Sequence, residues 1–252
     1  VAIVLDYESR FATRALPQGR GYAASAIALD WYSAVARLGV DVDFIGQHSD
    51  LSGYSLVLAP DLVIPDAAFL ARLKASKAKT LFGPRSGSKT RDMHIPADLP
   101  PGPLADLLDF RVTRVESLPD YHSEPVLYGN ASHPVTGWRE LIRTNETVLA
   151  TFEGEHRPGS PAVIGNDRAR YVGTLPRGEF LAKLMGDTLG WAGVGSLPDL
   201  GDLRLARRGR LHFAFNYGSS SAVVPAGADA TFLVGGRQLA PVDVAIWTEG
   251  GN

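Results

Sequence analysis

The chain has 252 residues, of which 45% are hydrophobic and 21% charged, and its formal net charge is −2. Charges of both signs are scattered along it, so it offers no basic face and nucleic acid is not an expected partner. Cysteine is absent, which excludes disulfides and a thiol nucleophile, and no apolar run approaches the roughly 18 residues that a membrane-spanning helix needs.

The first part of the chain alternates between strand patterns and helical patterns. Short apolar, β-branched runs predict strands at 1–5, 40–45, 52–59 and 79–82. A helix is expected over 23–38, where apolar residues recur at helical spacing and Gly39 follows as a cap, and another is expected after Pro65. This alternation predicts an α/β fold in which helices flank a mostly parallel sheet.

The helical rhythm lapses between Gly83 and Pro119, apart from a short turn at 104–108 and a strand at 112–115. Long irregular segments in compact domains usually serve an interface or a site. Further on, the pattern predicts a helix over Trp138 to Arg143, strands at 148–152, 162–164 and 170–173, and a closing helix that ends near Leu189.

The pattern changes after Gly193. Short apolar runs at 203–205, 211–215, 222–224, 231–233 and 242–247 are divided by glycine, proline and serine clusters. This spacing predicts a small antiparallel β-sandwich, with domains of 1–194 and 195–252. Because a strand pattern begins at Val1 without a methionine, we also expect the natural polypeptide to continue upstream.

The octet Gly83 to Thr90 is one glycine short of a phosphate-binding loop, because Ser88 stands where the pattern requires glycine. A phosphate loop opens directly into a helix whose N-terminal amides hold the anion. Here four prolines between Pro96 and Pro103 prevent a long helix. A nucleotide cofactor is therefore not expected.

The same stretch resembles a family signature. The run RSGSKTRDMHIPADLPPGPL at 85–104, followed by VTRVESL at 112–118, is similar to the middle domain of family 42 β-galactosidases, the trimerisation domain. The segments VAIVLDYES, YSLVLAP, PAVIGN and YVGT fit that domain in the same order. Beyond about residue 195 the likeness fades to the general character of the small β-domain that ends such enzymes.

The resemblance implies the assembly portion of a cytoplasmic β-galactosidase, without a cofactor, that forms a homotrimer. The parent enzyme would hydrolyse terminal β-D-galactosyl residues with retention, on a (β/α)8 barrel that this chain lacks. Retention needs two carboxylates about 5 to 5.5 Å apart, at the ends of barrel strands. No catalytic residue is therefore expected here, and Asn145-Glu146 is interpreted as a turn.

A second interpretation follows from a likeness to class I glutamine amidotransferase-like and flavodoxin-like folds, in which a nucleophile follows a central strand. The corresponding turn lies near 82–86, where no cysteine stands and where Ser86 lacks a G-x-S-x-G context. His94, His122 or His133 would have to act as its base. The alternative function is thus a small-molecule-binding or degenerate amidotransferase-like protein. The histidines are widely separated, so no metal site is expected.

A proline-rich segment cannot satisfy its backbone by helix or sheet alone, so ordering it favours packing against another surface. The candidate loop or interface residues are Arg85, Ser86, Lys89, Arg91, Leu104 and Phe110. Leu99, Leu107 and Leu108 would add apolar surface, and the arginines and lysine are expected at a polar rim. A cyclic trimer uses two different patches, and the sequence does not locate the second one.

Overall fold

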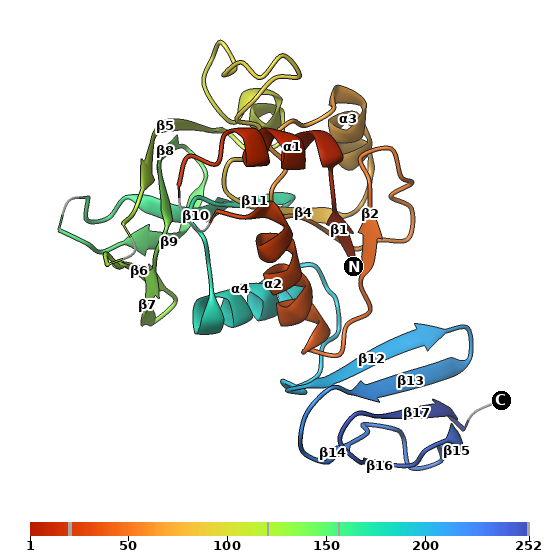
Figure 1. Cartoon of the computed structure of the whole chain (residues 1–252). Coiled ribbons are helices and arrows are strands. Elements are labelled where there is room, and N and C mark those ends of the chain that lie inside the picture. The colour runs from red at the N-terminus through yellow and green to blue at the C-terminus, as the bar shows by residue number, and fades with distance from the viewer. Residues whose placement is uncertain (20–21, 120, 156, 251–252) are drawn as a thin grey trace. The chain divides into compact units, whose positions relative to one another are not determined.

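The computed structural model describes residues 1–19, 22–119, 121–155 and 157–250 (Figure 1). They form two compact units. The first comprises residues 1–31 and 43–194, and the second comprises residues 32–42 and 195–252. Helix α2 (Ala24–Ala36) therefore contributes to both units. None of the helices in these ranges has the length and apolar character that a bilayer span requires.

The first unit is built on a mixed sheet whose described strands follow the order β2-β1-β3-β4-β11-β10-β9-β6-β7. The strands are β1 (Ala2–Val4), β2 (Asp43–Ile45), β3 (Leu56–Ala59), β4 (Lys79–Phe82), β6 (Glu124–Tyr128), β7 (Ala131–Val135), β9 (Thr147–Phe152), β10 (Pro161–Gly165) and β11 (Ala169–Val172). Pairing is parallel from β2 through β11 and antiparallel from β11 through β7. The expected α/β architecture is confirmed, and an antiparallel half extends it.

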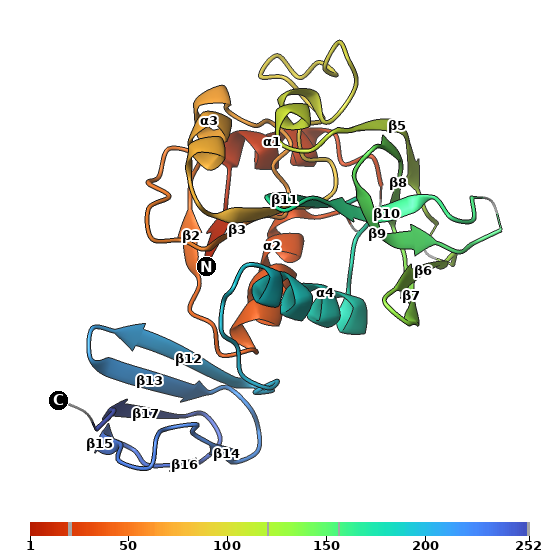
Figure 2. The ribbon, with the colours of Figure 1, turned by 180° about the vertical axis from the view of Figure 1, so that it is seen from behind.

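Two layers cover this sheet. Helix α3 (Ala67–Ala75), the short 3-10 helix η1 (Gly102–Asp106) and the pair β5 (Phe110–Ser117) and β8 (Trp138–Thr144) share one apolar core with the sheet. Helices α2 and α4 (Gly178–Trp191) lie side by side on the opposite face, as Figures 1 and 2 show. Helix α1 (Tyr7–Ala15) directly follows β1, at the carboxyl edge of the parallel strands.

Aspartates start two of these helices. The Asp6 carboxylate accepts from the backbone N–H of Ser9 at 2.7 Å, and Asp66 accepts from that of Phe69 at 3.0 Å. Each satisfies one of the donors that a helix leaves open in its first turn. The caps thereby start α1 directly after β1, and α3 after the loop that follows β3.

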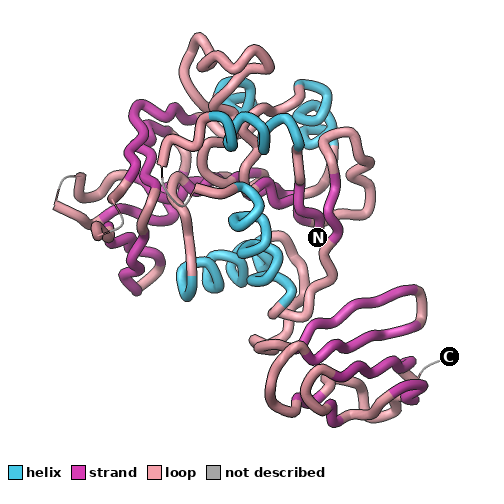
Figure 3. Tube along the Cα trace, viewed as in Figure 1, coloured by secondary structure: helices cyan, strands magenta, loops and turns pink. Residues whose placement is uncertain are grey.

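The second unit contains an antiparallel sheet in the order β12-β13-β17-β15 and a small pair, β14-β16 (Figure 3). The strands are β12 (Leu203–Arg208), β13 (Leu211–Asn216), β14 (Ala222–Val223), β15 (Thr231–Val234), β16 (Gln238–Leu239) and β17 (Asp243–Thr248). Alternate residues point inward, so that Leu203, Ala214 and Trp247 share one core. The expected antiparallel region is confirmed.

One element was predicted wrongly. Residues Trp138 to Arg143 form strand β8, not a helix. The first five residues of β8 are all buried, because the strand is covered on both faces. A strand covered in this way loses the alternation that marks a half-exposed one, and its run then fits a helical spacing as well.

Candidate functional site

The loop from Gly83 to Lys89 leaves β4 at the carboxyl edge of the parallel strands, where ligand sites of α/β folds lie. Its backbone N–H groups donate to the carbonyl oxygens of Ala59, Leu62 and Val63, over 2.8 to 3.1 Å. A Cβ atom on Gly83 would lie 2.1 Å from the Pro60 carbonyl oxygen, and one on Gly87 2.0 Å from that of Pro101. The glycines therefore let this loop enter the interior, where it is packed rather than open.

Arg85 is the central residue of this loop. It adopts a positive φ of 64°, a strained conformation for a residue with a side chain. Its guanidinium lies 4.8 Å from the ring centre of Tyr22 and 5.5 Å from that of Trp138, and donates to the carbonyl oxygens of Leu16 and Pro17. Only 2% of the residue is exposed. Arg85 thus links the end of α1 to β8 from inside the unit.

Glu140 of β8 lies beneath the loop. One carboxylate oxygen accepts from the Arg85 backbone N–H at 2.9 Å and from the Trp138 indole N–H at 3.0 Å, and the other accepts from the Tyr171 hydroxyl. Burial raises the pKa of Glu140 and raises that of Tyr171 well above its ordinary value. All of these partners belong to the protein interior, so Glu140 holds the loop in place.

A second buried carboxyl, Asp61, follows β3. The Thr13 and Tyr22 hydroxyls lie 3.0 and 2.9 Å from its two oxygens. Burial raises its pKa to about 7, and the charge of Asp6 adds to the rise, whereas the two hydroxyls and Arg85 oppose it. Asp61 is therefore a largely buried carboxyl group whose pKa lies near neutral pH.

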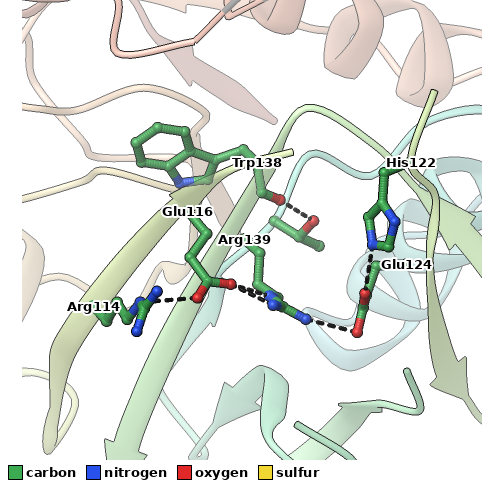
Figure 4. Close-up of polar contacts among 7 residues, drawn as sticks. Arg114, Glu116, His122, Glu124, Trp138 and Arg139 are labelled. Carbon is green, nitrogen blue, oxygen red and sulfur yellow. Dashed lines mark hydrogen bonds and ion pairs between the residues drawn. The ribbon is translucent and has the colours of Figure 1, made fainter. Parts of the chain in front are cut away.

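A cluster of charged side chains joins β5, β6 and β8 (Figure 4). The buried Arg139 guanidinium pairs with Glu116 and lies 2.7 Å from a Glu124 oxygen, while His122 lies 3.1 Å from the other Glu124 oxygen. Glu116 also pairs with the exposed Arg114 at 2.9 Å. Arginine bridging two carboxylates in this way holds the β5–β8 pair against the antiparallel half of the main sheet.

The structure separates the six candidate residues into two sets. Arg85, Ser86, Leu104 and Phe110 are at most 2% exposed. Arg85 therefore lies inside rather than at the expected polar rim. Lys89 is half-buried, and the exposed Arg91 faces Glu8 at 3.4 Å and Asp66 at 3.6 Å. An interface role for these residues stays a prediction, and burial within the chain restricts direct contact to Lys89 and Arg91.

Ser86 is not arranged as a nucleophile. It is fully buried, and its hydroxyl lies 3.5 Å from the Ala59 carbonyl oxygen. A serine nucleophile requires a base within hydrogen-bond reach and access for a substrate, and the loop provides neither around this hydroxyl. Over the ranges that the structure describes, no three His, Cys, Asp or Glu residues gather in a way that could hold a metal ion.

Sequence reasoning missed Asp61, Tyr22 and Glu140, and it missed helix α1. The helix carried a readable signal, because Asp6 stands three residues before Ser9 and the stretch that follows lacks proline and glycine. The buried acids carried none. Nothing near Asp61 or Glu140 in the sequence shows that residues from distant segments surround it.

Comparisons with known proteins agree with this architecture. Residues 1–195 match the model of the β-galactosidase trimerisation domain, and residues 202–249 match that of the β-galactosidase C-terminal domain. A β-galactosidase of Thermus thermophilus is 39% identical over 99% of this chain, and BgaA of a Thermus species is 38% identical over 99%. This chain spans 38% of the length of each of these relatives.

Solved structures show the same fold. The β-galactosidase of the psychrophilic Marinomonas ef1 aligns over 99% of this chain with a TM-score of 0.91 and 31% identity, and the chain covers 37% of it. That of the haloarchaeon Halorubrum lacusprofundi aligns over 99% with a TM-score of 0.89 and 30% identity, and the chain covers 39% of it. The chain therefore belongs to the family 42 β-galactosidases, of which it carries the trimerisation domain and the C-terminal domain.

Proposed function

We propose that this chain is the assembly portion of a cytoplasmic, homotrimeric enzyme that hydrolyses terminal β-D-galactosyl residues with retention. The match of residues 1–195 to a trimerisation domain carries the proposal. The chain also spans only 37% and 39% of the solved β-galactosidases of Marinomonas ef1 and Halorubrum lacusprofundi. The proposed division of labour assigns catalysis to the remaining part of such an enzyme.

The carboxyl groups of the chain support this division. A retaining glycosidase needs a nucleophile and an acid/base about 5 to 5.5 Å apart, both open to a sugar. Glu140 and Asp61, which lie at the edge of the sheet where a site is expected, are buried and accept hydrogen bonds from neighbouring protein groups. Both are engaged in contacts within the fold and are not available to a glycoside.

The segment 83–119 is the proposed first half of the subunit contact. Its exposed large hydrophobic residues are Ile95, Leu99 and Val115, which are 59%, 46% and 45% exposed. Of the apolar residues expected there from sequence, Leu99 alone keeps this degree of exposure, while Leu104 and Leu108 pack into the core. The outer part of the segment therefore provides contact surface, and its inner part anchors it.

Two measurements on the purified 252-residue chain test the proposal. Light scattering is expected to give three times the mass of the chain, and a chromogenic β-galactoside is expected to remain intact. A monomer would count against assembly through this chain. Turnover that is lost on Ser86→Ala, or on changing a single glutamate, would contradict the non-catalytic role.

A further inference from the structure

In helix α1 the small residues face the interior and the large aromatic residues face solvent. It buries the small residues Ser9, Ala12 and Thr13 and exposes two large aromatic ones, Tyr7 at 73% and Phe11 at 67%. Tyr7 and Phe11 are four residues apart, so they lie on one face of the helix. A single exposed aromatic residue is ordinary, but an adjacent pair beside a groove is typical of a contact surface.

The groove beside this face has a volume of about 560 Å³. Tyr7, Phe11 and Tyr22 contribute aromatic surface to it, and Arg10 and Arg14 contribute positive charge. Its described lining contains no carboxylate. A complementary occupant is therefore apolar at its centre and acidic at its border.

The chain itself carries a segment with these properties. In the 92–99 loop, Ile95 and Leu99 are exposed apolar residues, and Asp92 and Asp98 are exposed acids, of which Asp98 also pairs with Arg111 of its own chain at 3.3 Å. Helix α1 follows β1 and this loop follows β4, so both leave the carboxyl edge of the same parallel strands, and Figures 1 and 2 show them at one end of the unit. Two different patches at one end of a protomer suit a cyclic trimer, whose contacts pair unlike surfaces.

We propose that the α1 groove of one copy receives the 92–99 loop of the next copy, which would make α1 the second patch of the trimer. This inference rests on the proposed function, because it takes the assembly to be a trimer of this chain. Phe11 and Tyr7 then pack against Ile95 and Leu99, while Arg10 and Arg14 face Asp92 and Asp98.

The absence of cysteine from the chain allows a direct test. Phe11→Cys and Leu99→Cys chains, one of them tagged so that their masses differ, are produced in the same cells and treated with a short bismaleimide. A contact raises the effective concentration of the two thiols from micromolar to millimolar, so the mixed cross-link should form on the order of a thousandfold faster than for a pair that meets only by diffusion. The control combines Phe11→Cys with Val223→Cys, an exposed position of the second unit.

A mixed cross-link between the two chains in a particle of trimer mass supports the proposal. A trimer without it overturns the proposal and leaves the proposed function standing. Cross-linking of Phe11→Cys only to itself would show a two-fold contact and also overturns it. A monomer overturns both, and Ile95→Cys in place of Leu99→Cys repeats the measurement at a second loop position. All substituted positions are exposed, so these variants keep the fold.

Discussion

At the scale of single residues, a charged Asp61 carboxylate has too few hydrogen-bond donors around it. The Thr13 hydroxyl lies near both Asp61 and the Ser9 carbonyl, and the Tyr22 hydroxyl lies near both Asp61 and the Pro84 carbonyl. Each hydroxyl donates only one hydrogen. A proton on Asp61 adds a third donor, which agrees with a pKa raised to about 7, chiefly by burial.

This raised pKa sets the direction of a pH effect. The folded state keeps the Asp61 proton up to about pH 7, whereas the unfolded chain loses it near pH 3.8. The stabilisation is therefore complete below pH 3.8 and is lost as the pH rises towards and through 7, and its full size corresponds to roughly 4 kcal/mol.

The Asp61→Asn variant, whose side chain stays neutral, should lack this loss of stability. Urea unfolding at several pH values should show that the free energy of unfolding of the variant rises relative to that of the parent chain between pH 4 and 8. Asp167→Asn, at an exposed position, is the control. An equal pH dependence in both chains would contradict the assignment.

Single residues of the site were only partly predictable. Arg85 and Ser86 were found because they stand in a glycine-rich stretch after a strand. That Arg85 turns inward depends on Tyr22 and Trp138, which are far away in the sequence. Composition and spacing show which side chains a loop carries but not the distant rings that receive them.

At the scale of elements, the entry of the 83–89 loop into the interior depends on glycine. Gly83→Ala should destabilise the chain by about 2 kcal/mol or more, because its Cβ would overlap the Pro60 carbonyl within backbone that cannot easily move. Gly186→Ala is the matched control. Nothing lies within 4 Å of a Cβ there, and the position is inside helix α4, so it should stabilise by about 0.5 to 1 kcal/mol. Thermal unfolding of the parent chain and the two variants measures both effects. If Gly83→Ala left the stability unchanged, the loop backbone would have to move away from the added Cβ without cost.

Elements were predictable where a strand was short and apolar or a helix carried an apolar stripe, whereas β6 and β7 were missed although their residues alternate between buried and exposed. Strands β1, β3 and β4 and helix α2 were found by those patterns. Helix α1 was missed because its large residues point outward, so that no apolar stripe marks an inner face. Strand β8 was mistaken for a helix because both of its faces are covered. The errors at α1 and β8 thus fall at elements whose side chains do not all pack against a single core.

At the scale of the whole molecule, we expect residues 195–201 to be the first site of limited proteolysis, since residues 195–199 are exposed and no helix or strand includes this stretch. The stretch is held by Arg37, whose guanidinium pairs with Asp199 at 2.8 Å and whose carbonyl accepts from the Leu200 N–H. Arg37→Ala should therefore speed the cut, and mass spectrometry of timed digests locates it. First cleavage within 162–189 would show that the proposed boundary is misplaced.

The discontinuous second unit has a consequence for synthesis on the ribosome. Residues 32–42 belong to it, and Arg37 meets its partner Asp199 only 162 positions later. All residues of the first unit have been synthesised by residue 194, whereas residues 32–42 can pack into the second unit only after residues 195 onward have been made. A messenger truncated after residue 194 would therefore yield a product with the end of α2 uncovered, and such a product should bind chaperones longer than the complete chain does.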